Sequence, residues 1–201
     1  PELAESWEAS KDAVTWTFKL RKGVEFHNGK TIDADDVIYS FNEHRGPDTK
    51  SAAKGIAEPI TDIKADGKNT VVFTLKEGNA DFPYIASDYH ISMVPKGTKG
   101  KEYEKGVGTG PFILQAWEPG VRFFGKRNPN YFKSGRPYFD EVEILGIEDL
   151  SARTNSLKTG QIHVMNRCDP KTFHLLEKMP GVQAIKLEGA RHYTIPMLTT
   201  I

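Results

Sequence analysis

The sequence predicts a mixed α+β fold, and three observations lead to that prediction. Alternating polar and apolar residues form hairpin-like pairs of segments in the first two-thirds of the chain. From Glu141 onward the order changes to strand, helix, strand, helix and strand. The 201 residues are 38% hydrophobic and 27% charged, which is typical of a chain that folds around a core. A chain of this length can bury such a core without disulfides or metals.

The charge balance and the cysteine content exclude several classes of protein. The chain holds 27 Lys and Arg residues against 27 Asp and Glu residues, so its formal net charge is zero. We therefore expect no nucleic-acid partner, because phosphate binding usually leaves a basic surplus. No apolar run approaches the roughly 20 residues that a membrane helix needs. Cys168 is the single cysteine, which excludes an internal disulfide and a multi-cysteine zinc site.

The clearest strand and the clearest helix follow one another near the start of the chain. Residues 15–20 alternate with period two, which indicates a strand with one buried face. A helix is expected over residues 33–45, where Asp33 can cap the first turn and Asp36 occupies the third helical position. Ile32 and Val37 have the spacing of a hydrophobic staple around that cap. Gly46 and Pro47 are expected to end this helix.

Further elements are expected in order up to residue 126. They are a hairpin over 60–65 and 70–75, a short helix over 81–89, a strand over 91–94, a loop over 96–106, and a second hairpin over 112–117 and 121–126. The residues Glu118, Pro119, Gly120 and Val121 fit a type II turn, with Pro second and Gly third. The second hairpin is therefore the one whose turn type is best defined.

The last third of the chain is expected to alternate strands and helices. The expected elements are strands at 141–147, 162–165, 182–187 and 192–197, and helices at 151–159 and from Asp169 to Pro180. The composition changes in the loop over 127–137, which is rich in Asn, Pro and Gly. This change suggests two subdomains, one rich in β-structure and one α/β.

No catalytic constellation stands out in the sequence. The glycine cluster at 106–111 precedes a strand and not a helix, which indicates a structural turn and not a phosphate loop. Cys168 is interpreted as a packed thiol. Capping explains Asp33 and Asp36, and Asp35 is an ordinary first-turn acid. We therefore expect no enzyme activity and no catalytic residue.

The histidines and tyrosines leave two alternatives open. None of the six histidines forms a spaced metal-binding pair, so no metal and no cofactor are expected, although a site assembled from distant positions stays possible. Tyr84, Tyr89, Tyr193 and Trp117 either line a small-molecule pocket or belong to a half-buried core. A binding module is favoured on these grounds.

Several segments, in the correct order, resemble one known family across the whole chain. These segments are residues 3–8, 15–29, 33–41, 108–112, 127–131, 136–142, 151–153 and 157–162. Together they resemble the family 5 extracellular solute-binding proteins, which are the dipeptide, oligopeptide and nickel receptors of ABC importers. His163 departs from the family pattern, which usually has Asp at that position.

The resemblance implies a periplasmic-binding-protein-like lobe and a chain that is a fragment of a two-lobed receptor. Residues 15–115 would form a β-rich inserted subdomain. Residues 1–14 and 116–201 would supply part of an α/β core subdomain, and the second lobe would be absent. The implied function is capture of a small di- or oligopeptide in the periplasm and its delivery to ABC permease subunits in the membrane. The truncated chain is expected to self-associate.

The ligand-binding residues implied for this lobe are Tyr89, His90, His192, Tyr193 and Thr194. The alternative within the family is a receptor for a metal chelate, a heme or a sugar. An enzyme and a structural envelope domain are the alternatives from other classes.

Overall fold

The computed structural model describes residues 2–187, and the chain divides into two compact units, Pro1–Leu145 and Gly146–Ile201. Both helices and sheets are present, so the expected mixed α+β class is confirmed. The bounds of these units differ from the expected subdomains. The division of the lobe into an inserted subdomain over 15–115 and a flanking core stays a prediction.

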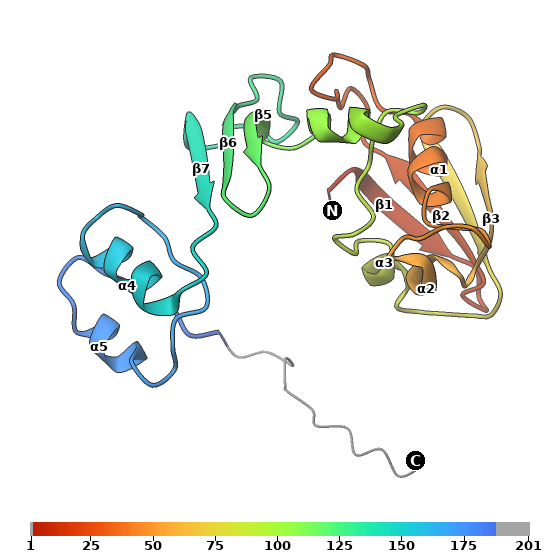
Figure 1. The fold of residues 1–201 in the computed structure, drawn as a ribbon. Coiled ribbons are helices and arrows are strands. Elements are labelled where there is room, and N and C mark those ends of the chain that lie inside the picture. The colour runs from red at the N-terminus through yellow and green to blue at the C-terminus, as the bar shows by residue number, and fades with distance from the viewer. Residues whose placement is uncertain (1, 188–201) are drawn as a thin grey trace, which may run out of the picture. The chain divides into compact units, whose positions relative to one another are not determined.

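Four antiparallel strands form the main sheet of the first unit (Figure 1), in the order β1-β2-β4-β3. The strands are β1 (Ala4–Ala9), β2 (Thr15–Leu20), β3 (Ile60–Ala65) and β4 (Thr70–Leu75). The expected strand at 15–20 and the expected hairpin at 60–75 are confirmed. Trp16 of β2 stands opposite Phe73 of β4, and both side chains are buried. Period-two alternation buries alternate apolar residues of β2 and β4 on one face of the sheet and leaves the half-buried Val72 on the other face.

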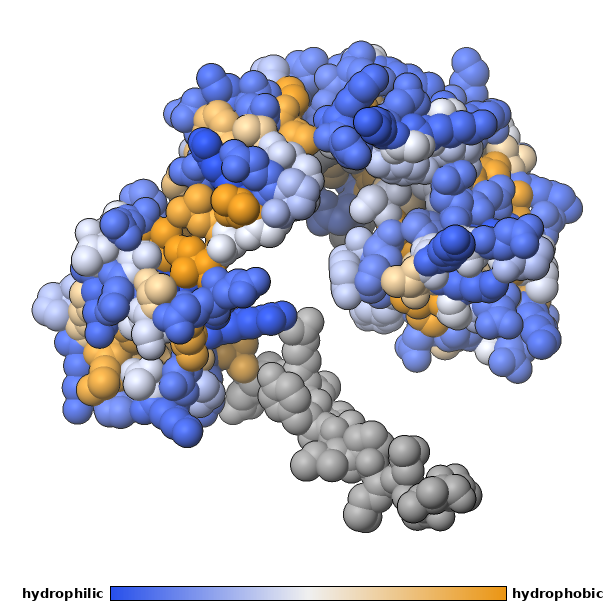
Figure 2. All heavy atoms as spheres, viewed as in Figure 1, coloured by the Kyte–Doolittle hydropathy of each residue, from blue (hydrophilic) through white to orange (hydrophobic). Residues whose placement is uncertain are grey.

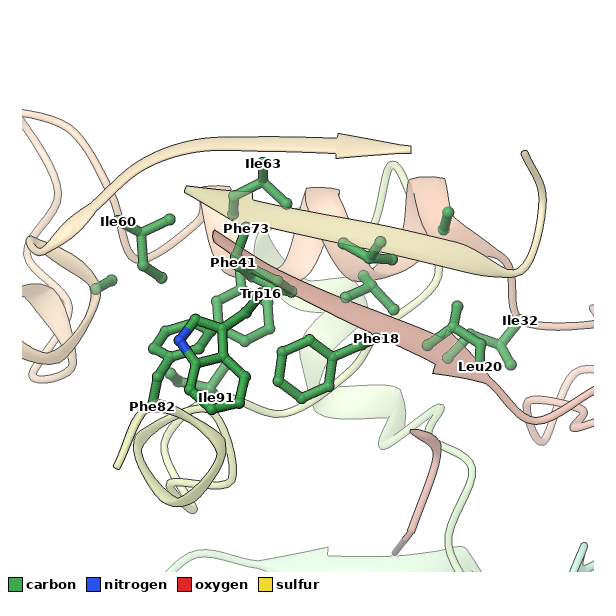
Figure 3. Packing of buried hydrophobic residues seen from close by; sticks show 14 of the residues in the cluster. Trp16, Phe18, Leu20, Ile32, Phe41, Ile60, Ile63, Phe73, Phe82 and Ile91 are labelled. Carbon is green, nitrogen blue, oxygen red and sulfur yellow. The ribbon is translucent and has the colours of Figure 1, made fainter. Parts of the chain in front are cut away.

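An aromatic cluster holds the helices against this sheet (Figure 3). Phe41 of helix α1 (Ala34–Asn42) lies edge-on to Phe73, with ring centroids 4.9 Å apart. Phe82 of α3 (Phe82–Ile85) lies 5.3 Å from the Phe73 ring and 6.1 Å from the Phe18 ring. A third helix, α2 (Lys54–Ala57), contributes the buried Ala57. Phe73 therefore sits at the centre of the core.

Helix α1 begins as the sequence predicts but ends earlier. Asp33 caps it with its side chain, and Asp36 closes the capping box from the third helical position. The helix ends at Asn42, three residues before the expected end at Arg45. Turns follow the end of the helix, and they lead to Gly46, whose φ of 100° favours glycine.

A second, three-stranded antiparallel sheet contains β5 (Phe112–Glu118), β6 (Arg122–Arg127) and β7 (Glu141–Leu145). The expected turn is confirmed, because the Val121 N–H donates to the Glu118 carbonyl over 3.0 Å and Gly120 has a φ of 75°. Trp117, Phe123 and Ile144 stand side by side across the three strands. Figure 2 shows apolar residues exposed in this part of the surface.

The segment between the two sheets differs from the expected strand at 91–94 and the expected short helix at 81–89. Helix α3 has only four residues, and the segment 91–94 is irregular. The Val94 N–H donates to the Ser40 hydroxyl of α1 over 3.0 Å instead of joining a strand. Ile91 is buried nonetheless. The apolar residues of this segment therefore suggested a strand, although they are buried without pairing to one. A 3-10 helix, η1 (Gly100–Lys105), interrupts the expected loop at 96–106.

The second unit contains two helices within its described residues, α4 (Leu150–Lys158) and α5 (Phe173–Glu177). Asp149 caps α4 by accepting a hydrogen bond from the Ala152 N–H over 2.6 Å. The expected strands at 162–165 and 182–187 are wrong, since these residues are irregular. Up to residue 187 this unit offers no neighbouring strand that could pair with them. The expected strand at 192–197 lies outside the described residues.

Candidate functional site

Two of the five expected ligand-binding residues lie together in the first unit. The Tyr89 side chain is 81% exposed, and its ring lies against the His90 imidazole with centroids 3.9 Å apart and planes at 33°. Both residues follow α3 in the turn that leads to the buried Ile91. His192, Tyr193 and Thr194 lie outside the described residues, so these positions stay predictions.

Asp88 fixes the orientation of His90. One oxygen of the Asp88 carboxylate accepts the His90 backbone N–H over 2.9 Å and contacts Nδ1 of the same imidazole at 2.7 Å. The backbone hydrogen bond, followed by the bond from the imidazole, holds the pKa of Asp88 below its usual value. A carboxylate that accepts at Nδ1 leaves Nε2 as the ring atom available to a ligand.

His90 belongs to a depression of about 330 Å³ that we call the histidine pocket. Its lining comes from the end of α1, the loop after it, the segment after α3, and η1. The lining residues are Ser40, Glu43, His44, Thr49, Ser51, His90, Ser92, Val94 and Tyr103. The pocket thus gathers two imidazoles, several hydroxyls and one carboxylate. None of these described lining residues is a lysine or an arginine.

His44 is the second imidazole of the histidine pocket. It follows the end of α1, and its backbone N–H donates to the Phe41 carbonyl over 3.1 Å. Its Nδ1 lies 2.6 Å from the Ser51 hydroxyl, which also accepts the Ala53 N–H over 3.0 Å. Burial, and to a lesser degree His90, lower the pKa of His44, although Glu43 opposes this shift. His44 is therefore neutral at pH 7.

Glu43 carries the negative charge of the pocket wall. The Tyr103 hydroxyl donates to its carboxylate over 2.8 Å. Burial, followed by the hydrogen bond to Glu43, raises the pKa of Tyr103 far above its usual value. Tyr103 consequently stays protonated and links η1 to the end of α1.

A larger depression of about 880 Å³ lies near the C-terminal end of α1, and Arg45 and Lys54 are among its lining residues. Both of these cationic side chains already donate hydrogen bonds to backbone carbonyls. The Arg45 guanidinium donates to the carbonyls of Ile60 and Thr61 over 2.7 and 3.0 Å, and the Lys54 ammonium donates to the Pro47 carbonyl over 2.8 Å. Because these groups close the loop after α1, the smaller histidine pocket is the better candidate site.

The glycine cluster at 106–111 serves a structural purpose. The His27 backbone N–H donates to the Gly108 carbonyl over 2.8 Å, and Nε2 of its ring lies 3.0 Å from the Gly110 carbonyl. Strand β5 begins at Phe112, directly after the cluster. The segment therefore lacks the helix that a phosphate loop requires.

Cys168 is a free, half-buried thiol in the segment between α4 and α5.

Some residues of the pocket were missed by sequence reasoning. His44, Ser51 and Tyr103 carry no motif, and their distance from His90 along the chain hides their proximity. Tyr84 and Trp117, two further candidate aromatics, are 79% and 53% exposed, so neither belongs to the buried core.

Within residues 2–187 no group of three His, Cys, Asp or Glu side chains is arranged to hold a metal. None of the helices described there has the length and apolar character needed to cross a bilayer.

The comparisons with known proteins decide the family. The model of the bacterial extracellular solute-binding proteins, family 5, matches residues 1–200. This chain belongs to that family. Its members are solute-binding receptors and not enzymes.

Three similar proteins place the family match in context. The dipeptide-binding protein of Escherichia coli is 28% identical over 94% of this chain and 40% of its own length. The periplasmic binding protein DppA from Helicobacter pylori, solved with the peptide STSA, has 30% identity and a TM-score of 0.76 over 90% of this chain and 40% of its own. AgaA from A. tumefaciens R10, solved with agropinic acid, has 30% identity and a TM-score of 0.83 over 90% of this chain and 37% of its own. The chain thus spans about two-fifths of these relatives.

Proposed function

We propose that this family 5 chain is part of a periplasmic substrate-binding component that captures a di- or oligopeptide and delivers it to ABC permease subunits. The family match over residues 1–200 is the observation that carries the proposal. The peptide-binding relatives from E. coli and H. pylori support a peptide as the ligand. Because the chain spans about 40% of each, a whole receptor would contribute further contacts to that ligand.

Tyr89 and His90 are the proposed peptide contacts in the described part of the chain. The exposed Tyr89 ring offers a flat apolar surface with a polar hydroxyl, and the Asp88 carboxylate holds His90 in one orientation. Peptide receptors of this kind bind the main chain by hydrogen bonds and leave side chains in roomy, hydrated pockets. His192, Tyr193 and Thr194 are proposed as further contacts on the basis of the resemblance alone.

A non-peptide ligand is the second candidate within the family. AgaA, which was solved with agropinic acid, shares 30% identity with this chain. A metal chelate, a heme or a sugar would then occupy the place of the peptide. This alternative concerns the identity of the ligand and leaves the receptor function unchanged.

Mass spectrometry of small molecules that co-purify with the longer receptor would identify the ligand class. A mixture of peptides supports the proposal, whereas a single non-peptide compound supports the alternative. Calorimetry with a dipeptide library, in buffer that contains EDTA, then measures affinity. Tyr89→Ala should weaken peptide binding, and Tyr84→Ala is the matched control because its ring is similarly exposed. Equal affinity of both variants and the wild type would exclude Tyr89 from the site.

A further inference from the structure

Asn28 and Gly29 form the only Asn-Gly pair in the sequence, and both residues lie exposed in the turn that precedes α1. An asparagine side chain can react with the backbone nitrogen of the next residue. Glycine at that position favours the reaction, because it has no Cβ to hinder the approach of its nitrogen. The proposed peptide contacts include neither residue. The pair is therefore a candidate site of spontaneous covalent modification.

The reaction in question is deamidation through a succinimide. The Gly29 nitrogen loses its proton to a base from the solvent and attacks Cγ of Asn28. The new C–N bond closes the succinimide ring, the bond between Cγ and Nδ2 breaks, and Nδ2 takes a proton from water and leaves as ammonia. Water then opens the ring at either carbonyl, so residue 28 becomes Asp or isoaspartate.

The turn engages both reacting groups in other hydrogen bonds. The Gly29 N–H donates to the Phe26 carbonyl over 2.8 Å, and Oδ1 of Asn28 accepts the Lys30 N–H over 3.1 Å. The Phe26 N–H donates to the Lys30 carbonyl over 2.8 Å and closes the turn. While these bonds hold, the Gly29 nitrogen keeps its proton, and the Asn28 amide is directed toward Lys30. The closed turn therefore opposes the reaction.

His27 fastens this turn to the glycine cluster at 106–111. Its backbone N–H donates to the Gly108 carbonyl over 2.8 Å, and Nε2 of its ring lies 3.0 Å from the Gly110 carbonyl. The Gly108 N–H donates to Nδ1 over 3.4 Å, so a neutral ring with its proton on Nε2 satisfies both ring contacts. Phe26, the preceding residue, is buried in the core. The turn is thus held by the core and by the glycine cluster together.

We propose that Asn28 is a latent deamidation site, which the contact between His27 and the glycine cluster keeps unreactive. Asn28 would be converted only in chains whose turn has opened. Isoaspartate adds a methylene group to the backbone, so the Gly29 N–H would no longer be placed to donate to the Phe26 carbonyl. Conversion would therefore mark an opening permanently. The inference does not depend on peptide transport, since it concerns only residues of this chain.

Peptide mapping by mass spectrometry can follow conversion of Asn28 in the untagged 201-residue chain at mildly alkaline pH. We expect conversion to be about tenfold slower, or slower still, in the folded chain than in urea. His27→Ala should accelerate conversion in the folded chain. His163→Ala is the matched control, because His163 is exposed in the second unit, and its rate should equal that of the wild type. Equal rates in folded and unfolded wild type, or in folded His27→Ala and wild type, would overturn the proposal.

A second measurement covers the case in which His27→Ala loses its fold. In the wild type, hydrogen exchange followed by NMR should find the Gly29 amide protected by about tenfold or more relative to an unstructured peptide. An unprotected Gly29 amide would overturn the proposal.

Asn155, which precedes Ser156, is the internal reference for reactivity in the unfolded chain. Asn28 should be converted faster than Asn155 in urea, because serine carries a Cβ next to the attacking nitrogen and glycine does not. Equal conversion of the two residues in urea would contradict the assignment of Asn28 as the reactive site.

Discussion

Asp33 and Asp36 exchange hydrogen bonds across the first turn of α1. The Asp33 N–H donates to the Asp36 carboxylate over 3.0 Å, and the Asp36 N–H donates to the Asp33 carboxylate over 3.2 Å. Asp36 is fully buried and also accepts the Lys96 N–H over 2.7 Å and the Lys30 ammonium. The helix start is thereby tied to a segment about sixty residues further along the chain.

The cap itself should have a measurable effect on stability. We expect Asp33→Ala to reduce the free energy of unfolding by about 1 kcal/mol, because one N–H at the helix start loses its acceptor. Urea denaturation followed by circular dichroism measures the loss. Asp35→Ala is the control, since within residues 2–187 Asp35 pairs only with the exposed Lys96 ammonium. Equal stability of Asp33→Ala and wild type would mean that Asp36 alone holds the helix start.

Asp36 should make stability depend on pH. Burial alone would raise its pKa, but Lys30 and the backbone N–H groups of Lys96 and Asp33 outweigh burial and lower it. The folded pKa lies below the unfolded value of about 3.9, so this stabilisation is complete above that value and is lost as the pH falls through the folded pKa. We expect Asp36→Asn to lose about 2 kcal/mol at pH 7. Denaturation at several acidic pH values should show a shallower pH dependence in this variant, and an unchanged dependence would contradict the assignment.

Phe73 should be among the costliest side chains to truncate. Its ring contacts Phe18, Phe41 and Phe82, so Phe73→Ala would leave a cavity at the centre of the core. The expected loss in the free energy of unfolding is about 4 kcal/mol. Ile144→Ala is the control, because Ile144 is 60% exposed and its truncation should cost less than about 0.5 kcal/mol. Similar losses in both variants would argue against this core.

On the proposed function, the 201-residue chain should bind peptides much more weakly than a receptor of the full length of its relatives. If the absent part supplies contacts worth about 4 kcal/mol, affinity falls by about a thousandfold. Calorimetry of both proteins against one dipeptide library compares them. Micromolar binding by the 201 residues alone would place the whole site within this chain.

Self-association should depend on the apolar face of the three-stranded sheet. Trp117 and Ile144 are 53% and 60% exposed on a row shared with Phe123. We expect the double variant Trp117→Ser, Ile144→Ser to shift the chain toward monomer in sedimentation velocity. An associated wild type with an equally associated variant would assign association to another surface, and a monomeric wild type would contradict the expected self-association.

The parts of the fold that were predictable are those where burial and local pattern agree. β2, β4 and the start of α1 alternate regularly and bury their apolar residues, so the sequence pattern identifies them. β1 was missed because most of its residues are exposed and its pattern is weak. The strands expected at 162–165 and 182–187 failed because a strand needs a partner, which local pattern does not reveal.

The candidate site was predictable only in part, for a related reason. Tyr89 and His90 are neighbours in the sequence, and the family resemblance implied both as ligand contacts. His44 joins them only because α1 and the segment after α3 pack together, as the bonds between Ser40 and Val94 show. Proximity of this kind depends on tertiary packing and leaves no trace in spacing.

The strand order β1-β2-β4-β3 also affects how fast the first unit folds. β1 with β2 and β3 with β4 are hairpins that close over short loops, whereas β2 and β4 meet only after the whole of residues 21–69 has been looped out. Closing that loop carries an entropic cost before any pairing offsets it, so the two hairpins form early and their docking limits the rate. Truncations at the β2–β4 seam should slow folding, whereas truncations in the exposed β1 edge should chiefly hasten unfolding.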